Sequence, residues 1–300
     1  MVGGPPFSFE FVPAPADLSP YLNSLYVLRI GPHRIEEVLP AYSGQLMLAS
    51  SGKGRMDFGD GFVEAPEDAF FTGPLTAARP FSIDGPALVL GASFTFHGWA
   101  ALTRLPTVQN SDRFLTAEQG LGGPAGGDAL SLTRRVRAGE IDAKAALGEL
   151  GAILRTAIKP LPAGHADLIQ ATYDWLSSSL NPEPERLYAS LPLSERQVQR
   201  LVKRFFGLAP SRLRRRYRAI RAATLLADPG LSDARRIEVL QSFYDQAHLI
   251  REIREFTGRT PRLLASGKDA VGIETLGPQG YGVVELFAGE ESEQLGKEPG

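Results

Sequence analysis

The chain has 300 residues, 43% of them hydrophobic, and a formal net charge of −2 at pH 7. This length and composition predict two ordinary soluble domains, each with its own core. The sequence has no apolar run of about 18 residues and no basic-then-apolar N-terminal segment, so we expect a cytoplasmic protein without a membrane partner. Cysteine is absent, which excludes disulfides and zinc–cysteine sites.

The first part of the chain, up to about Arg104, is rich in Gly and Pro and contains short apolar runs. These runs are Tyr26–Ile30, Gln45–Ala49, Ala69–Thr72 and Ala87–Leu90. Turn-forming residues separate them at regular intervals. Short strands with such spacing predict a β-sandwich or β-barrel.

Two segments in this part, TGPLTAARPF (Thr72–Phe81) and GASFTFHGWAAL (Gly91–Leu102), resemble the cupin-type domain that often precedes a DNA-binding unit. The resemblance covers roughly residues 7–120 and implies a sensing or interaction domain. A small barrel has room for one small-molecule effector. Where such domains often have Pro-Asp-Gly, this chain has Pro40-Ala41-Tyr42, so the role of that acid is not carried over.

An enzyme is not expected, and neither is a metal or cofactor. Catalytic cupins hold a metal with clustered histidines, whereas His33, His97, His165 and His248 are scattered here. A metal-dependent cupin enzyme joined to a DNA-binding unit therefore lacks its ligands. No phosphate-binding glycine loop is found in a strand-turn-helix context.

From roughly Leu130 to Leu180 the pattern becomes helical. One apolar stripe consists of Leu147, Leu150, Ile153, Leu154 and Ile158. Such a stripe can join domains or pair two protomers into a homodimer, and it can equally pack inside its own chain.

The sequence R-x4-F-x-G-x-x-P occurs twice, beginning at Arg200 and again 51 residues later at Arg251. A residue suited to capping a helix precedes each copy, Ser194 in the first and Asp245 in the second. Apolar residues with helical spacing follow the first cap: Val198, Leu201, Val202 and Phe205. A short helical stretch and a turn precede each copy, at 185–190 and 233–241, which is the order of a helix-turn-helix.

The basic residues are concentrated in the same region. Residues 185–264 hold 17 Lys and Arg against 8 Asp and Glu, a net charge of +9, whereas the rest of the chain holds 15 against 26. One basic block in a near-neutral chain is typical of a protein that binds nucleic acid. Two similar helical units indicate a partner that is read at two sites, such as duplex DNA.

The segments LPLSERQVQRLVKRFFGLAPSRL (Leu191–Leu213) and FYDQAHLIREIREFTGRTP (Phe243–Pro261) resemble the two helix-turn-helix units of AraC/XylS-type bacterial transcription regulators. The resemblance covers roughly Asp167–Leu264 and implies two recognition helices that enter successive major grooves. It places seven residues at base edges: Arg196, Gln199, Arg200, Gln246, Ala247, Ile250 and Arg251. Their chemistry agrees, because Arg matches guanine, Gln matches adenine, and Ile or Ala meets a thymine methyl.

A further helix is predicted over Ser211–Ala227, between the two units. Its residues would span about 25 Å, a suitable strut between helices one DNA turn, ~34 Å, apart. The arginines at 212, 214, 215, 216 and 218 can neutralise phosphates, or can be solvated or paired with acids. The residues assigned to phosphates are Lys203, Arg204, Arg212, Arg214, Arg215 and Arg254.

Four residues depart from the pattern of this family. Pro192 and Ser242 replace the usual turn glycine, and Tyr188 and Glu238 replace a small alanine in the preceding helix. Proline cannot adopt the positive φ that glycine allows, so the first turn must be built differently. The departures support an alternative, a sensor or interaction protein whose degenerate units no longer read DNA.

We therefore expect an α+β protein of several domains. These are a cupin-like β domain over residues 1–125, a helical connector over 126–165, a double helix-turn-helix domain over 166–265, and an acidic, Gly-rich tail over 266–300. The tail is expected to be mostly disordered, with one short strand at 282–287. The expected function is sequence-specific transcription regulation, with promoter DNA, RNA polymerase and a small effector as candidate partners.

Overall fold

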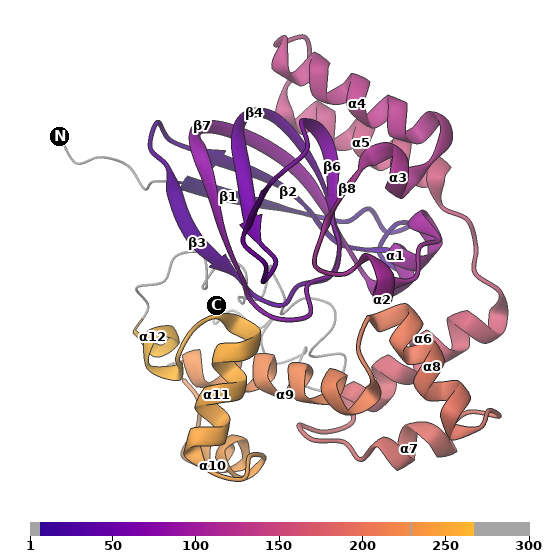
Figure 1. Ribbon diagram of the computed structural model, residues 1–300, viewed down its shortest axis with the longest axis vertical. Helices are drawn as coiled ribbons and strands as arrows, with labels where there is room; N and C mark the ends of the chain where they lie inside the picture. Colours follow the sequence, from indigo (N-terminus) through magenta and orange to yellow (C-terminus); the bar gives the residue numbers. More distant parts are fainter. Residues whose placement is uncertain (1–6, 229, 267–300) are drawn as a thin grey trace, which may run out of the picture. The chain divides into compact units, whose positions relative to one another are not determined.

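A computed structural model describes residues 7–228 and 230–266. The chain divides into two compact units, with the boundary between Leu161 and Pro162 (Figure 1). In the described residues, the first unit is an antiparallel sheet with helices, and the second contains helices alone. This arrangement confirms the expected fold class of a β domain followed by an all-α domain. The tail and the strand predicted at 282–287 lie outside the described residues.

Within the described residues, the first unit is built on one antiparallel sheet of eight strands. The strands are β1 (Phe7–Pro13), β2 (Leu22–Ile30), β3 (Ile35–Leu39), β4 (Gln45–Asp57), β5 (Phe62–Glu64), β6 (Asp68–Thr72), β7 (Arg79–Phe94) and β8 (Phe114–Thr116). Their order is β1-β2-β7-β4-β6-β8, with β3 on β7 and β5 on β4. The pairing of β4 with β7 shifts register on both sides of Ser51, and such shifts let long strands bend.

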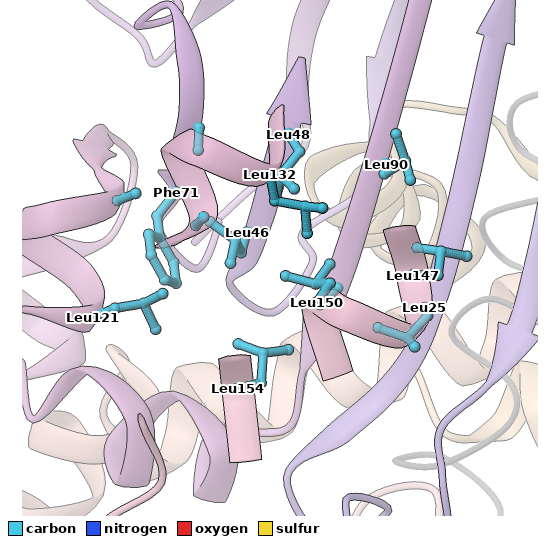
Figure 2. Close-up of a cluster of buried hydrophobic side chains, with 14 of the residues drawn as sticks. Leu25, Leu46, Leu48, Phe71, Leu90, Leu121, Leu132, Leu147, Leu150 and Leu154 are labelled. Carbon is cyan, nitrogen blue, oxygen red and sulfur yellow. The ribbon is translucent and has the colours of Figure 1, made fainter. Parts of the chain in front are cut away.

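Helices close one face of this sheet. Side chains alternate along the strands, so Leu25, Leu46, Phe71 and Leu90 all point to this face, where they are buried (Figure 2). Trp99 joins the same core from the helical side. The helices of this unit are α1 (Phe96–Thr103), α2 (Thr107–Asn110), α3 (Ala117–Leu121), α4 (Gly123–Arg137) and α5 (Ala143–Ala157).

The predicted apolar stripe lies on α5 and faces the sheet. Leu147, Leu150 and Leu154 are buried in the same core as the strand residues (Figure 2). Ile153 packs against that core and is partly buried. Burying a leucine contributes about 1.5–3 kcal/mol, so the stripe holds α5 on the sheet. The alternative in which these leucines pair two protomers is wrong, because they are already covered inside their own chain.

The opposite face of the sheet is also filled by side chains. The ring of Tyr26 on β2 lies across Gly91 on β7, and a Cβ built on Gly91 would fall 2.1 Å from that ring. The phenol donates a hydrogen bond of 2.7 Å to Gln45 Oε1. Burial, together with the neighbouring Tyr42, raises the pKa of the Tyr26 phenol, so the hydroxyl keeps its proton and remains a donor.

The second unit is arranged around its longest helix, α9, against which α8, α10, α11 and α12 pack. Its helices are α6 (Ala163–Ser177), α7 (Pro184–Ala189), α8 (Glu195–Phe206), α9 (Pro210–Ala227), α10 (Asp233–Gln241), α11 (Gln246–Thr257) and α12 (Pro261–Ala265). The connecting helix predicted over Ser211–Ala227 is confirmed and begins one residue earlier, at Pro210. Proline suits a first helical position because its missing N–H would have no partner there.

Candidate nucleic-acid interface

The first helix pair consists of α7 and α8. Ser194 caps α8 in a reciprocal arrangement, accepting from the Gln197 N–H at 3.4 Å while its own N–H donates to Gln197 Oε1 at 2.9 Å. Val198, Val202 and Phe205 are buried, as the helical spacing predicts. The opposite side of α8 is left exposed.

The second pair, α10 and α11, has the same plan. Asp245 caps α11 by accepting the N–H of His248 at 2.6 Å. Leu249, Ile253 and Phe256 are buried along one side of the helix. The ring of His248 also acts at the helix start, because its Nδ1 accepts from the Tyr244 N–H at 3.4 Å.

The turns inside the two units differ in length. Helix α7 is closed by Ser190 and α8 is capped by Ser194, whereas α10 is closed by Ser242 and α11 is capped by Asp245. The first turn therefore contains one more residue between its caps. The Leu193 N–H donates to the Leu191 carbonyl at 2.8 Å, which makes a tight turn around Pro192.

The two bulky replacements in the first helices are accommodated at the surface. The Tyr188 hydroxyl accepts a hydrogen bond from Gln199 Nε2 at 3.3 Å, so it links α7 to α8. Glu238 is exposed and pairs with Arg235 on its own helix. Ser242 has φ −72° and closes α10 without a left-handed residue. The departures are thus absorbed, and the starts of α8 and α11 keep their caps.

All seven residues predicted at base edges are exposed on α8 or α11: Arg196, Gln199, Arg200, Gln246, Ala247, Ile250 and Arg251. Across the part of the chain that the structure describes, Arg196, Arg200 and Arg251 make no ion pair with a carboxylate. Gln199 donates to Glu195 Oε1 at 2.9 Å, on its own helix.

The residues predicted at phosphates fall into two groups. Lys203, Arg204 and Arg254 are exposed, and within residues 7–228 and 230–266 they have no acidic partner. The other three are paired with acids of the same unit: Arg212 with Glu255 at 3.2 Å, Arg214 with Glu183 at 3.4 Å, and Arg215 with Glu252 at 2.6 Å. A phosphate would have to compete with those carboxylates.

Two arginines of α9 cannot neutralise phosphates. Arg216 is 1% exposed and Arg218 is 6% exposed, so the prediction of a phosphate role is wrong for both. The arginine run covers almost two helical turns of α9, and packing against α11 on one side buries part of it.

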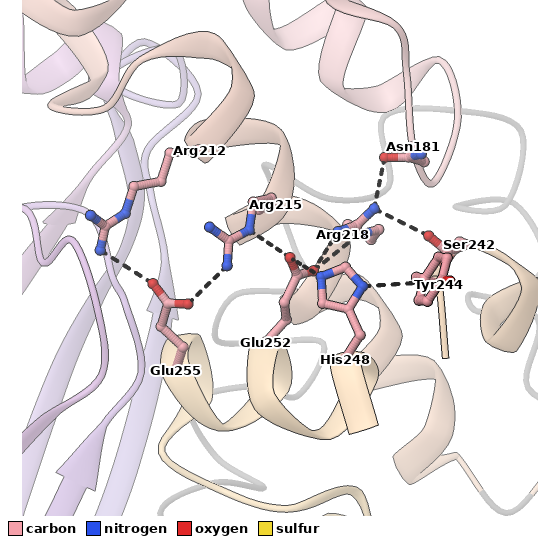
Figure 3. A network of polar contacts seen from close by, with 9 residues as sticks. All are labelled: Asn181, Arg212, Arg215, Arg218, Ser242, Tyr244, His248, Glu252 and Glu255. Atoms are coloured by element: carbon pink, nitrogen blue, oxygen red, sulfur yellow. Dashed lines mark hydrogen bonds and ion pairs between the residues drawn. The ribbon is translucent and has the colours of Figure 1, made fainter. Parts of the chain in front are cut away.

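Glu252 is the residue that the sequence analysis missed in this unit. It is almost completely buried beside the apolar stripe of α11, and it binds Arg215 and Arg218 of α9 (Figure 3). Glu252 lies three residues after Leu249 and four before Phe256, on the apolar side of a helix that packs on the arginine-rich α9. That spacing is the signal that could have found it.

The described residues hold no group of three His, Cys, Asp or Glu residues placed to bind a metal ion. None of the described helices is both long enough and apolar enough to cross a membrane.

The two capped helix pairs, joined by α9, define a double helix-turn-helix domain. Residues 187–265 match a family model described as a helix-turn-helix domain, and this domain is of the AraC type.

The chain is also similar to solved structures at low sequence identity. ToxT from Vibrio cholerae O395 is 9% identical with a TM-score of 0.43, over 87% of this chain and 99% of ToxT. ToxT bound to (E)-4-(8-methylnaphthalen-1-yl)but-3-enoic acid is 10% identical with a TM-score of 0.43, over 87% of this chain and 98% of that chain. The AraC-like transcriptional activator CuxR is 12% identical with a TM-score of 0.28, over 70% of this chain and 85% of CuxR. No curated protein matches this sequence.

Proposed function

We propose that this chain is a sequence-specific transcription regulator that binds duplex DNA through α8 and α11. The observation that carries the proposal is the pair of helices with buried apolar stripes and exposed polar rows, in a block with a net charge of +9. The match of residues 187–265 to a helix-turn-helix family supports the same function. In such units the second helix lies in the major groove.

Base recognition is assigned to the exposed rows. Arg196, Arg200 and Arg251 would each present a guanidinium fork to guanine O6 and N7, since no carboxylate among the described residues holds them. Gln199 and Gln246 would pair with adenine. Ala247 and Ile250 would lie against thymine methyl groups.

Phosphate binding is assigned first to Lys203, Arg204 and Arg254, whose charges are exposed. Arg212, Arg214 and Arg215 remain assigned to phosphates through exchange with their carboxylate partners. Because each exchange releases an acid that repels DNA, we expect these three to contribute less than the exposed group.

The rival function is a sensor or interaction protein whose units no longer read DNA. It rests on Tyr188, Pro192, Glu238 and Ser242. The caps at Ser194 and Asp245 favour DNA binding, because the replaced residues leave both helix starts intact.

We further propose that the first unit controls how the second unit binds DNA. A small effector, RNA polymerase or a second copy of the chain are its candidate partners. The apolar stripe of α5 gives no support to self-association, because its leucines are buried in the first unit. An effector can shift DNA affinity only by its differential affinity for two states of the chain.

Selection of bound sites from random duplex DNA by the full chain tests the function. The selected duplex is then titrated at increasing salt. If all six phosphate positions bind, the slope of log K against log salt should be about −5. No binding at low salt, or a flat response to salt, would refute DNA recognition.

A further inference from the structure

Glu252 joins α11 to α9 through a buried polar network (Figure 3). Its Oε1 accepts from Arg215 Nε at 2.6 Å, and its Oε2 accepts from Arg218 Nη2 at 2.6 Å. His248 Nε2 lies 3.0 Å from Oε1. The Glu252 side chain is 1% exposed, so both carboxylate oxygens are satisfied by protein groups.

Arg218 extends this network beyond the two helices. Its Nη1 donates to Asn181 Oδ1 at 3.0 Å and to the Ser242 carbonyl at 3.1 Å. Its guanidinium also lies over the Phe243 ring, 4.7 Å from the centroid. One guanidinium therefore ties together α9, α11, the turn between α10 and α11, and the segment before α7.

The network supplies direction that the apolar contacts lack. Leu249, Ile253 and Phe256 set which side of α11 faces the core, but hydrophobic burial is non-directional and defines small rotations and shifts of the helix only weakly. Hydrogen bonds to a carboxylate depend on distance and angle. A buried ion pair adds little net stability over an apolar replacement, so a gain in stability alone does not account for the pairing of Glu252 with two arginines.

We propose that Glu252 is a positioning residue for base recognition. It fixes the rotation and depth of α11, and so the placement of Gln246, Ile250 and Arg251, without itself contacting DNA. This inference rests on the proposed function. A binding constellation must be held to within roughly 0.5 Å and 10–20° by its supporting residues, and Glu252 is such a support.

The test compares Glu252→Gln with Glu255→Gln in the full chain. Glu255 is the matched control, because it lies on the same helix and pairs with arginines of the same run, Arg212 and Arg215. Each variant is put through selection from random DNA, and base preference is scored at the half-site of each helix. Glu252→Gln should lower base preference at the α11 half-site about tenfold, with base preference at the α8 half-site unchanged. Glu255→Gln should keep its preference and change only affinity for all sequences.

Three outcomes overturn the inference. Glu252→Gln keeps its base preference, loses it equally at both half-sites, or loses no more of it at the α11 half-site than Glu255→Gln does. If Glu252→Gln does not fold, the double variant Glu252→Met with Arg218→Met removes both buried charges together, and wild-type preference in the folded double variant overturns the inference. If the unsubstituted chain binds no DNA, the proposed function fails as well, whereas the other outcomes leave that function standing.

Discussion

Gly207 and Gly258 occupy the same place in the two helix pairs, each in the left-handed region directly after α8 or α11. Their φ values are 78° and 73°. Each N–H donates to the carbonyl four residues earlier, Gly207 to Lys203 at 3.0 Å and Gly258 to Arg254 at 2.9 Å. Glycine is favoured there because it has no Cβ to clash. Helices α8 and α11 therefore each end directly before a glycine.

Gly258→Ala should lower the free energy of unfolding by about 1 kcal/mol, because alanine is strained at positive φ. Gly164→Ala is the control in the same unit: it lies in α6, and a Cβ there meets nothing within 4 Å. That substitution should raise stability by about 0.4–1 kcal/mol. Denaturant unfolding of both variants measures the difference, and equal effects would contradict the role of Gly258.

Arg200→Ala and Arg251→Ala should each lose about 1–3 kcal/mol on the selected duplex and relax base preference. Lys203→Ala should instead weaken all sequences similarly and reduce the salt slope by about one. Lys203 is the better probe of phosphate binding than Arg215, because Arg215 is already paired with Glu252. If all three variants weaken selected and random DNA alike, the division between base and phosphate contacts is wrong.

Glu252 should make the free energy of unfolding depend on pH in the acidic range. Burial acts to raise the pKa of this carboxyl, but hydrogen bonds and charge from Arg215 and Arg218 outweigh it, so the pKa lies below its usual value of 4.5. A carboxyl whose pKa is lower in the folded chain than in the unfolded chain stabilises the fold fully above the pKa of the unfolded state. That stabilisation is lost as pH falls through the pKa of the folded state. Between about pH 5 and pH 2, wild type should therefore lose more free energy of unfolding than Glu252→Gln. Parallel urea-unfolding curves across that range would exclude this linkage.

Leu150→Ala should cost about 2–5 kcal/mol of stability, because Leu150 is completely buried between α5 and the sheet. Lys144→Ala, at an exposed position of the same helix, should stay within about 0.5 kcal/mol. The mass of both variants in solution should equal that of the wild type. A change of oligomeric state in folded Leu150→Ala would mean that the stripe contributes to pairing after all.

Gly91→Ala should destabilise the first unit, since its Cβ would fall 2.1 Å from the ring of Tyr26. Overpacking of this kind costs about 1–3 kcal/mol. Tyr26→Leu should cost stability alone but recover part of the loss when combined with Gly91→Ala. A double-mutant cycle with purely additive losses would show that the contact between the two strands is not the cause.

The helices of the second unit could be predicted closely because their signals are local. Ser194, Asp245, Gly207 and Gly258 mark helix ends through bonds to residues three or four positions away. The helix over 233–241 has a cap of the same kind at Ser232, whereas the connecting helix begins at Pro210 without a side-chain cap. In the first unit the predicted apolar runs mark β2, β4, β6 and β7, whereas β1, β3, β5 and β8 were not predicted. The order in which β2, β7 and β4 pair depends on contacts far apart in the sequence.

The candidate site was only partly predictable. Exposure of Arg200 and Arg251 follows from helical spacing, whereas burial of Arg216 and Arg218 does not, because arginine alone predicts a solvated position. Arg218 is buried beside Glu252, which lies 34 residues further along the chain. Only tertiary packing brings those charges together. Contact of the seven assigned residues with bases stays a prediction.

The longer first turn, built around Pro192, means that the two helix pairs are not interchangeable copies. Three residues, Leu191, Pro192 and Leu193, lie between the caps of α7 and α8. Only two, Phe243 and Tyr244, lie between the caps of α10 and α11. Under the proposed function, the two helices would present different side chains to DNA. A regulatory site for this chain should therefore contain two half-sites of different DNA sequence. A genome scan for tandem or inverted repeats would miss such a site.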